Sequence, residues 1–241
     1  MIDLVSECNN FMKDCGFSYA VCGGYALELF LCKKLRPHSD IDLSVFEQDK
    51  ANMVSFLLNK GWNTCEILTI DIPSLSGCLR FISNPGDEKI AKLNHIWAIK
   101  PGCSIFELEQ EPGAKDVFNF KIVNNEQLNF DFIEIIFNKQ KDGNFVFDSS
   151  AGQGKNITRE LDKAILFSTG GVPYLAPEVK LFILSNPEYS ESDYHKAKNQ
   201  IDFDSTVSFL PKESRTWLIN ALETAYPNGH KRIGKLKGDI P

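Results

Sequence analysis

The sequence lacks the features that mark several large classes of protein. No apolar run approaches the roughly 20 residues that a membrane helix needs. The first seven residues show neither the positive start nor the apolar stretch of a signal peptide. None of the seven cysteines belongs to a CxxC pair, so neither a zinc site nor a disulfide framework is predicted. We therefore expect a cytoplasmic protein with reduced thiols and no membrane partner.

An excess of positive charge is also lacking, because the formal net charge is −6. Proteins that follow long nucleic acids usually carry a basic face. The one basic cluster lies near the end of the chain and is expected to be a solvated tail; it consists of Lys231, Arg232, Lys235 and Lys237. The four histidines show no paired metal-ligand spacing, which argues against the hypothesis of a metal-dependent phosphohydrolase. We expect small molecules as partners and no long nucleic acid.

The pattern of apolar residues predicts two parts. Residues 1–150 read as an α/β part, in which the apolar run 129–137 is predicted to be a strand in the middle of a sheet covered on both sides. A small-residue loop at 149–154 follows, and residues 151–241 read as helical, with helices opening at Pro177 and Pro211. The other expected helices span 1–14, 25–34 and 51–59, and the other strands span 18–22, 41–46, 66–72, 79–83, 95–99 and 145–147.

Two glycines, Gly23 and Gly24, separate a predicted strand from a predicted helix. Without side chains they let the backbone approach a bulky anion, and amides at a helix N-terminus point towards it with the helix dipole behind them. A double glycine is also common in ordinary tight turns. The pair therefore indicates a phosphate site only in combination with other features.

Asp40 and Asp42 supply such a feature. They alternate at the entrance of a strand, so their carboxylates leave the same face, roughly 6–7 Å apart at a rise of about 3.3 Å per residue. Two like charges at this spacing favour a bound cation, and hard oxygen ligands suit Mg²⁺. The alternative is a pair of solvated turn residues. Apolar neighbours at Ile41, Leu43 and Val45 argue against that alternative for Asp42.

A third acid, Glu134, stands inside the apolar run 132–137, where an unpartnered charge would cost several kcal/mol. A metal ion or a substrate proton would account for it. A buried salt bridge with Lys or Arg is the structural alternative. Asp131 is the competing third acid; it points to the opposite face and is expected to be solvated near the strand end.

These residues resemble the signature of the polymerase-β-type nucleotidyltransferases, most closely the aminoglycoside adenylyltransferase-like branch. The resemblance rests on the glycine pair, the spacing to Asp40 and the run Arg-Pro-His-Ser-Asp-Ile-Asp-Leu at 36–43. Further likeness lies in Ile-Glu-Ile at 133–135, the loop at 171–178 and the segment 196–203. Two positions depart from the pattern: Cys32 replaces a usual glycine, and Asn199 replaces a usual acid after Lys198.

The resemblance implies an α+β fold in which a nucleotidyltransferase domain with a mixed central sheet precedes a helical C-terminal domain. It implies transfer of a nucleoside monophosphate, AMP, from a nucleoside triphosphate to a hydroxyl of a small acceptor such as an aminoglycoside, bound between the two parts. Asp40, Asp42 and Glu134 would hold Mg²⁺ and act in catalysis. Nucleotide contacts would come from Gly23, Gly24, Ser39 and Lys198. Roles for Arg36, His38 and Lys180 stay open.

Two alternatives share this fold and phosphate loop. One is a regulatory or toxin–antitoxin-type module that binds nucleotide without turnover of a small molecule. The other is an enzyme that nucleotidylates a protein. The pattern of residues does not separate these possibilities, because all of them need the same nucleotide site.

Overall fold

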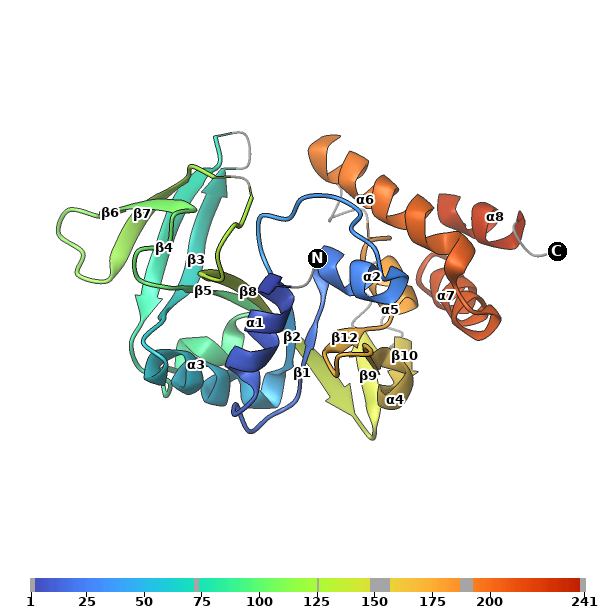
Figure 1. Cartoon of the computed structure of the whole chain (residues 1–241), viewed down its shortest axis with the longest axis horizontal. Coiled ribbons are helices and arrows are strands. Elements are labelled where there is room, and N and C mark those ends of the chain that lie inside the picture. The colour runs from blue at the N-terminus through green and yellow to red at the C-terminus, as the bar shows by residue number, and fades with distance from the viewer. Residues whose placement is uncertain (1–2, 72–73, 125, 148–156, 187–192, 239–241) are drawn as a thin grey trace. The chain divides into compact units, whose positions relative to one another are not determined.

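The computed structural model describes residues 3–71, 74–124, 126–147, 157–186 and 193–238 (Figure 1). The chain forms two compact units. The first contains Met1–Val21 and Arg36–Asn138, and the second contains Cys22–Leu35 and Lys139–Pro241. The loop predicted at 149–154, and with it the expected boundary at 150, lies outside the described residues. In the described part, no helix is both long and apolar enough to cross a membrane.

The first unit is built on a mixed sheet. Its strands follow the order β1, β2, β8, β5, β3, β4, β7 and β6. Only β2 and β8 run parallel to each other; the remaining neighbours in this order are antiparallel. The bounds are Tyr19–Val21 (β1), Asp42–Phe46 (β2), Asn63–Asp71 (β3), Ser76–Ile82 (β4), His95–Ile99 (β5), Phe106–Gln110 (β6), Val117–Ile122 (β7) and Phe132–Lys141 (β8). The predicted α+β class, the mixed sheet and the central place of β8 are confirmed.

Two helices, α1 (Asp3–Met12) and α3 (Lys50–Asn59), supply the helical layer of this unit (Figure 1). Helix α3 contacts β2 and β3. Phe11 of α1 packs its ring against Phe56 of α3 and against Trp62, with ring centroids 5.3 and 5.0 Å apart. Short 3-10 turns, Glu47–Asp49 and Glu88–Lys92, join the elements. In β2 the residues at odd positions, Leu43 and Val45, are fully buried, as a strand between layers requires.

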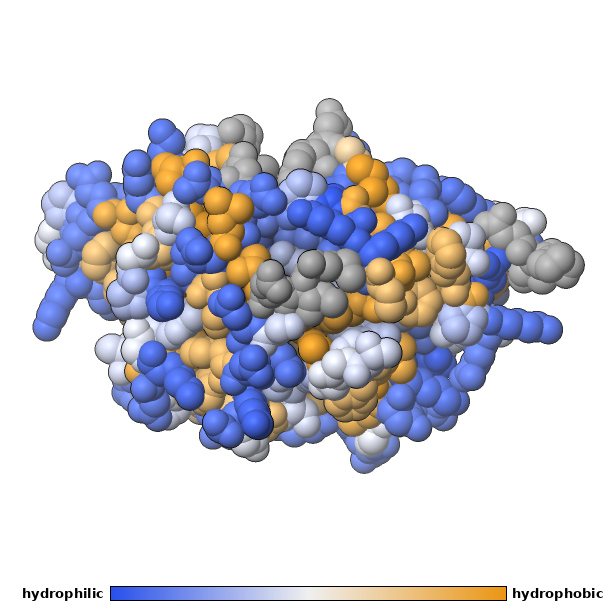
Figure 2. All heavy atoms as spheres, viewed as in Figure 1, coloured by the Kyte–Doolittle hydropathy of each residue, from blue (hydrophilic) through white to orange (hydrophobic). Residues whose placement is uncertain are grey.

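The opposite face of the sheet is curled around aromatic side chains. Three strands separate β5 from β6 in the sheet, yet the rings of Trp97 on β5 and Phe106 on β6 are 5.3 Å apart. An irregularity in β3 and the glycine Gly77 on β4 allow this curvature. A Cβ atom on Gly77 would lie 2.2 Å from the carbonyl oxygen of Thr69 and 2.8 Å from the ring of Phe120. Figure 2 shows apolar residues among polar ones on the visible surface over β3, β4 and β7.

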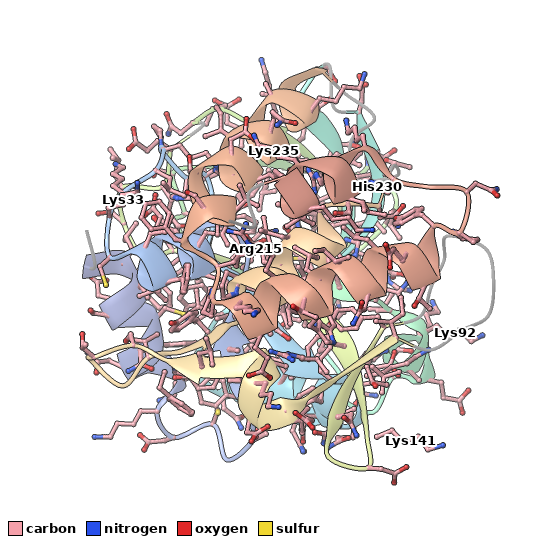
Figure 3. The ribbon with its side chains drawn as sticks, turned by 90° about the vertical axis from the view of Figure 1, so that its right-hand side faces the viewer. Lys33, Lys92, Lys141, Arg215, His230 and Lys235 are labelled. Atoms are coloured by element: carbon pink, nitrogen blue, oxygen red, sulfur yellow. The ribbon has the colours of Figure 1, made fainter. Side chains whose placement is uncertain are left out.

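The second unit is mainly helical. Helix α2 (Gly23–Leu31) shares a core with α5 (Pro177–Ile183), α6 (Asp193–Thr206), α7 (Lys212–Ala225) and α8 (Lys231–Gly238), with a 3-10 turn at Val207–Phe209. Leu27 of α2 is fully buried in that core beside Leu218 and Leu222 of α7. An early segment of the chain therefore stabilises the late helices. Figure 3 shows this unit with Arg215, His230 and Lys235 labelled.

The expectation that everything after residue 150 is helical is wrong. Strand β10 (Ile157–Glu160) pairs with β9 (Asn144–Phe147), which returns from β8 through a turn with positive φ angles at Asp142 and Gly143. A one-turn helix, α4 (Leu161–Ala164), leads into β11 (Ile165–Phe167), which pairs with β12 (Pro173–Leu175). These strands have three or four residues, too few to show a period of two in the sequence.

The expectation of a solvated basic tail is wrong in part: Lys231, Lys235 and Lys237 are exposed, but they lie on a helix that packs into the core. Lys231–Gly238 forms α8, in which Arg232 and Leu236 are buried. The Arg232 guanidinium donates to the Leu181 carbonyl and to the Ser185 hydroxyl, and it lies 4.6 Å from the ring of Phe203. The apolar residues Ile233 and Leu236 follow a helical spacing, so the segment has a face to bury.

Candidate functional site

Asp40, Asp42 and Glu134 come together at one place in the first unit. Asp42 on β2 lies directly opposite Glu134 on the parallel strand β8, and Asp40 precedes β2 by two residues. One ligand oxygen from each carboxylate lies within 4.8 Å of the other two. All three residues are half-buried. No other group of three His, Cys, Asp or Glu residues in the described part of the chain meets this criterion.

The main chain fixes this meeting point. Ile41, between the two aspartates, is fully buried, and its carbonyl accepts the amide N–H of Glu134 at 2.9 Å. Further along the same strands, Asn138 on β8 donates its side-chain amide to the hydroxyl of Ser44 on β2 at 2.9 Å. The register of β2 on β8 is therefore held next to Asp42 by the Ile41 carbonyl and again two residues beyond it by Ser44.

The carboxylates suit a divalent cation. Like charges this close repel one another in the absence of a positive partner. An octahedral Mg²⁺ ion takes oxygen ligands at about 2.0–2.1 Å, so oxygens on opposite sides of it lie roughly 4 Å apart. Carboxylate oxygens within 4.8 Å of one another need only small side-chain rotations to reach that geometry. The donor set therefore fits Mg²⁺.

Asp131 differs from expectation, because it is buried instead of solvated at the strand end. Its backbone pairs with Lys100, whose amide N–H donates to the Asp131 carbonyl at 2.9 Å. Burial raises the pKa of the neighbouring Cys103 thiol to about 11, and a hydrogen bond to Asp131 contributes. Asp131 is absent from the acidic group formed by Asp40, Asp42 and Glu134.

The loop before Asp40 is anchored by its own side chains. Arg36 places Nη1 3.2 Å from the His38 ring nitrogen Nδ1 and donates to the Pro37 carbonyl at 3.2 Å. His38 is buried, and its carbonyl accepts the amide N–H of Gln127 at 3.0 Å. These contacts tie the loop to the segment that enters β8. Ser39 is half-buried between His38 and Asp40.

The glycine pair opens α2 directly after β1 and Cys22. Gly23 has a φ of +64°, a left-handed conformation that disfavours any side chain. Both glycines are buried, and the Cys22 side chain makes no capping hydrogen bond to the first turn. This is the predicted strand–glycine–helix arrangement, and the pair belongs to the second unit.

Lys198 also belongs to the second unit, on α6, where it is half-buried. Its neighbour Asn199 is buried and accepts Arg232 on its carbonyl at 3.5 Å, so it belongs to the helical core. Lys180 is half-buried on α5. The nucleotide contacts predicted for Gly23, Gly24, Ser39 and Lys198 stay predictions.

One residue near the acids was not singled out from the sequence. Trp97 on β5 lies directly opposite Glu134, on the other side of β8 from Asp42. Residues opposite each other in a sheet project from the same face, so Asp42, Glu134 and Trp97 form one row. The strand 95–99 was predicted, but its neighbour in the sheet follows from tertiary pairing, which no local pattern reveals.

The chain is similar to one family model and to several solved structures. The family model for aminoglycoside-2''-adenylyltransferase matches residues 4–75. Three solved structures resemble the chain with a TM-score of 0.47: lincosamide antibiotic adenylyltransferase LnuA bound to lincomycin, and two structures of ANT(2'')-Ia, one in solution and one in complex with adenylyl-2"-tobramycin. In that order, the sequence identities are 13%, 12% and 10%. The matches cover 84%, 94% and 91% of this chain, and 96%, 93% and 95% of the matched chains.

No protein of curated function matches the sequence. The segment matched by the family model contains the glycine pair and both aspartates, whereas Glu134 lies beyond it. Over residues 4–75 the chain thus resembles the aminoglycoside adenylyltransferase-like branch of the nucleotidyltransferases.

Proposed function

We propose that this protein is a magnesium-dependent nucleotidyltransferase that transfers AMP from ATP to a hydroxyl of a small antibiotic-like acceptor. The convergence of Asp40, Asp42 and Glu134 carries the proposal, because three carboxylates within 4.8 Å form a donor set suited to divalent cations. The family match over residues 4–75 supports the choice of adenylyl transfer. The names of the similar structures suggest aminoglycosides and lincosamides as the first acceptors to try.

Each of the three acids has a role in the proposal. Asp40 and Asp42 would hold the cation, and Glu134 would complete the site. A bound divalent cation supplies Lewis-acid stabilisation of the charge that develops on the triphosphate. The acceptor hydroxyl attacks the α-phosphorus, the bond to pyrophosphate breaks, and Glu134 accepts the hydroxyl proton. This assignment gives a reason for a carboxylate in the apolar strand β8.

The glycine pair and the lysine have nucleotide-binding roles in the same proposal. Gly23 and Gly24 would receive phosphate oxygens at the N-terminus of α2, where backbone amides and the helix dipole favour anions. Lys198 would neutralise charge on the pyrophosphate. Ser39, next to Asp40, would donate its hydroxyl to a phosphate oxygen. Each role is testable by substitution, independently of the three acids.

The test is to incubate the purified protein with Mg²⁺ and ATP labelled on the α-phosphate. An aminoglycoside such as tobramycin is added in one series and a lincosamide such as lincomycin in another. We expect a labelled small molecule and an equal amount of pyrophosphate, both dependent on acceptor and on Mg²⁺. The products are separated by chromatography and identified by their mass.

Two outcomes would contradict the proposal. A labelled protein band in cell extract, with no labelled small product, would point to a protein-modifying enzyme. Binding of ATP without turnover against any acceptor would point to a regulatory module. The matched control is the Asp131→Asn variant, because Asp131 is an acid of the same segment that lies outside the three-carboxylate group. It should retain transfer if it folds, as judged by its melting temperature.

A further inference from the structure

The indole of Trp97 has an unusual environment. Its side chain is only 7% exposed, and none of the described residues accepts a hydrogen bond from its Nε1–H group. A buried donor without an acceptor is costly, and most buried tryptophans have a partner for this group. Such a group in a folded protein needs an explanation, and an acceptor that arrives in the working state of the protein is one.

The ring itself has little freedom to move. Three phenylalanine rings surround it at centroid distances between 5.2 and 5.3 Å, from Phe106 on β6, Phe120 on β7 and Phe132 on β8. The contacts with Phe120 and Phe132 are edge-on, an arrangement that aromatic pairs prefer, and the contact with Phe106 is tilted. The position of the indole N–H is therefore set by the fold of the first unit. A partner must come to it.

An acidic side chain, Glu134, lies directly opposite Trp97 in the antiparallel pair of β5 and β8. In such a pair the Cβ atoms are about 4.5–5.5 Å apart and the side chains share a face. A glutamate has three rotatable side-chain bonds and Glu134 is half-buried, so its carboxylate has room to turn. An indole N–H and a carboxylate at this separation can meet without any shift of the strands.

We propose that Trp97 is a positioning residue for Glu134: when the site is loaded, its indole N–H donates to one carboxylate oxygen of Glu134. The inference rests on the proposed function. A hydrogen bond of this charge-assisted kind would leave the second oxygen of Glu134 for the metal or the acceptor hydroxyl. The aromatic cluster then has a purpose beyond packing, because it holds the donor rigidly beside the acidic group.

The first test observes the indole directly. Uniformly ¹⁵N-labelled protein shows one indole N–H signal for each of its three tryptophans, and the Trp97→Phe variant identifies the signal of Trp97. We expect that signal to move downfield when Mg²⁺ and an ATP analogue with a non-hydrolysable α,β bond are added. Trp62 serves as the internal reference, because its ring packs with Phe11 and Phe130 and it is not a sheet partner of the three acids.

The second test separates positioning from binding. In the Trp97→Phe variant we expect kcat to fall roughly tenfold or more, as for loss of a hydrogen bond to a charged group, with the KM for ATP within about threefold of wild type. The matched control is Trp62→Phe, which removes the same atoms from another buried site and should change kcat by less than about twofold. Replacement of Trp97 by 3-benzothienylalanine, which keeps the ring shape and lacks the N–H, should reproduce the loss.

The outcomes distinguish the inference from the proposed function. If wild-type protein neither binds the analogue nor transfers AMP, both fall. If it does both while the Trp97 signal stays in place, or the benzothienyl protein keeps wild-type kcat, only the inference is overturned. A buried water that accepts the indole N–H of Trp97 in every state of the protein would give this second result.

Discussion

Two sites, one in each unit of the chain, hold buried or half-buried charge in opposite ways. In the second unit, Arg159 on β10 meets Glu178 on α5 at 2.7 Å, and both side chains are buried. In the first unit, three carboxylates face one another, within 4.8 Å. Opposite charges that neutralise each other belong to the fold, because such a pair needs no ligand to balance its charge. Like charges held together by a sheet lower stability, and a bound cation would offset that cost.

Arg232 extends the contrast within the second unit. Its charge is compensated by carbonyl and hydroxyl oxygens of Leu181 and Ser185 and by the ring of Phe203. Burial lowers the pKa of its guanidinium to about 10, because an apolar environment disfavours the charged form. Trp217 similarly covers Arg159, 5.4 Å from the ring centroid. Arg232 and Arg159 therefore have structural roles.

The largest effect is expected for Asp42→Asn. The change removes one charge from the three-carboxylate group and should lower transfer by several orders of magnitude, because charge stabilisation by the metal is lost. The melting temperature should stay the same or rise, because repulsion between the acids decreases. Turnover of a verified acceptor and thermal unfolding of the same preparation measure both results. Near-normal turnover would contradict the contrast between a catalytic acidic group and a structural ion pair, because Asp42 would then have no catalytic role.

A smaller effect, of opposite kind, is expected for Glu178→Gln. It leaves Arg159 buried beside a neutral side chain and should reduce the free energy of unfolding by about 3 kcal/mol. Urea denaturation measures the loss, and kcat of the folded variant should be close to that of wild type. Glu213→Gln is the matched control: Glu213 also contacts Arg159, at 3.6 Å, but is solvent-exposed, so the loss should be far smaller. Equal losses in the two variants would contradict the assignment of Glu178 as the structural partner.

The members of the acidic group could be predicted from the sequence, but their meeting in space could not. Asp40 and Asp42 alternate with the buried Ile41 and Leu43, a period of two that a strand pattern reveals. Glu134 stood out because it interrupts an apolar run. Their meeting depends on the parallel register of β2 on β8, which joins residues about ninety positions apart and has no local signature. The functional roles of these residues stay predictions.

Other features of the fold could not be predicted from the sequence, for physical reasons. Strand β6 alternates Phe106 and Leu108 with Glu107 and Glu109, but it lies at the edge of the curled sheet and is mostly exposed, so its apolar signal is weak. Helix α2 follows the first strand, yet its buried Leu27 packs in the core of the late helices. Such long-range packing decides which unit a segment joins. It cannot be predicted from the local composition of the chain.

Cys32→Gly sharpens the comparison at a position that departs from the family pattern. Cys32 ends α2 in the left-handed conformation, with φ 52° and ψ 33°, where glycine has no steric cost. The side chain is exposed, so little packing is lost. We expect the melting temperature to rise, with a gain of roughly 0.5–1 kcal/mol after the greater freedom of glycine in the unfolded chain is counted. Cys32→Ala is the control, since it removes the thiol but keeps the strain; a similar gain there would locate the effect in the thiol.

The smallest effect concerns His230, which lies at the start of α8 (Figure 3). Burial, with the nearby charges of Arg232 and Lys231, lowers its pKa below the ordinary 6.5, while the hydrogen bond to the Ser185 carbonyl opposes the shift. As the pH falls below 6.5, the unfolded chain therefore takes up the proton first, and the folded state loses stability. Between about pH 7.5 and about pH 5.5 the free energy of unfolding should decrease more steeply for wild type than for His230→Gln. Urea denaturation at each pH gives these free energies. Equal slopes of the free energy of unfolding against pH in the two proteins would mean that His230 has the same proton affinity in the folded and unfolded states, which would contradict the lowered pKa.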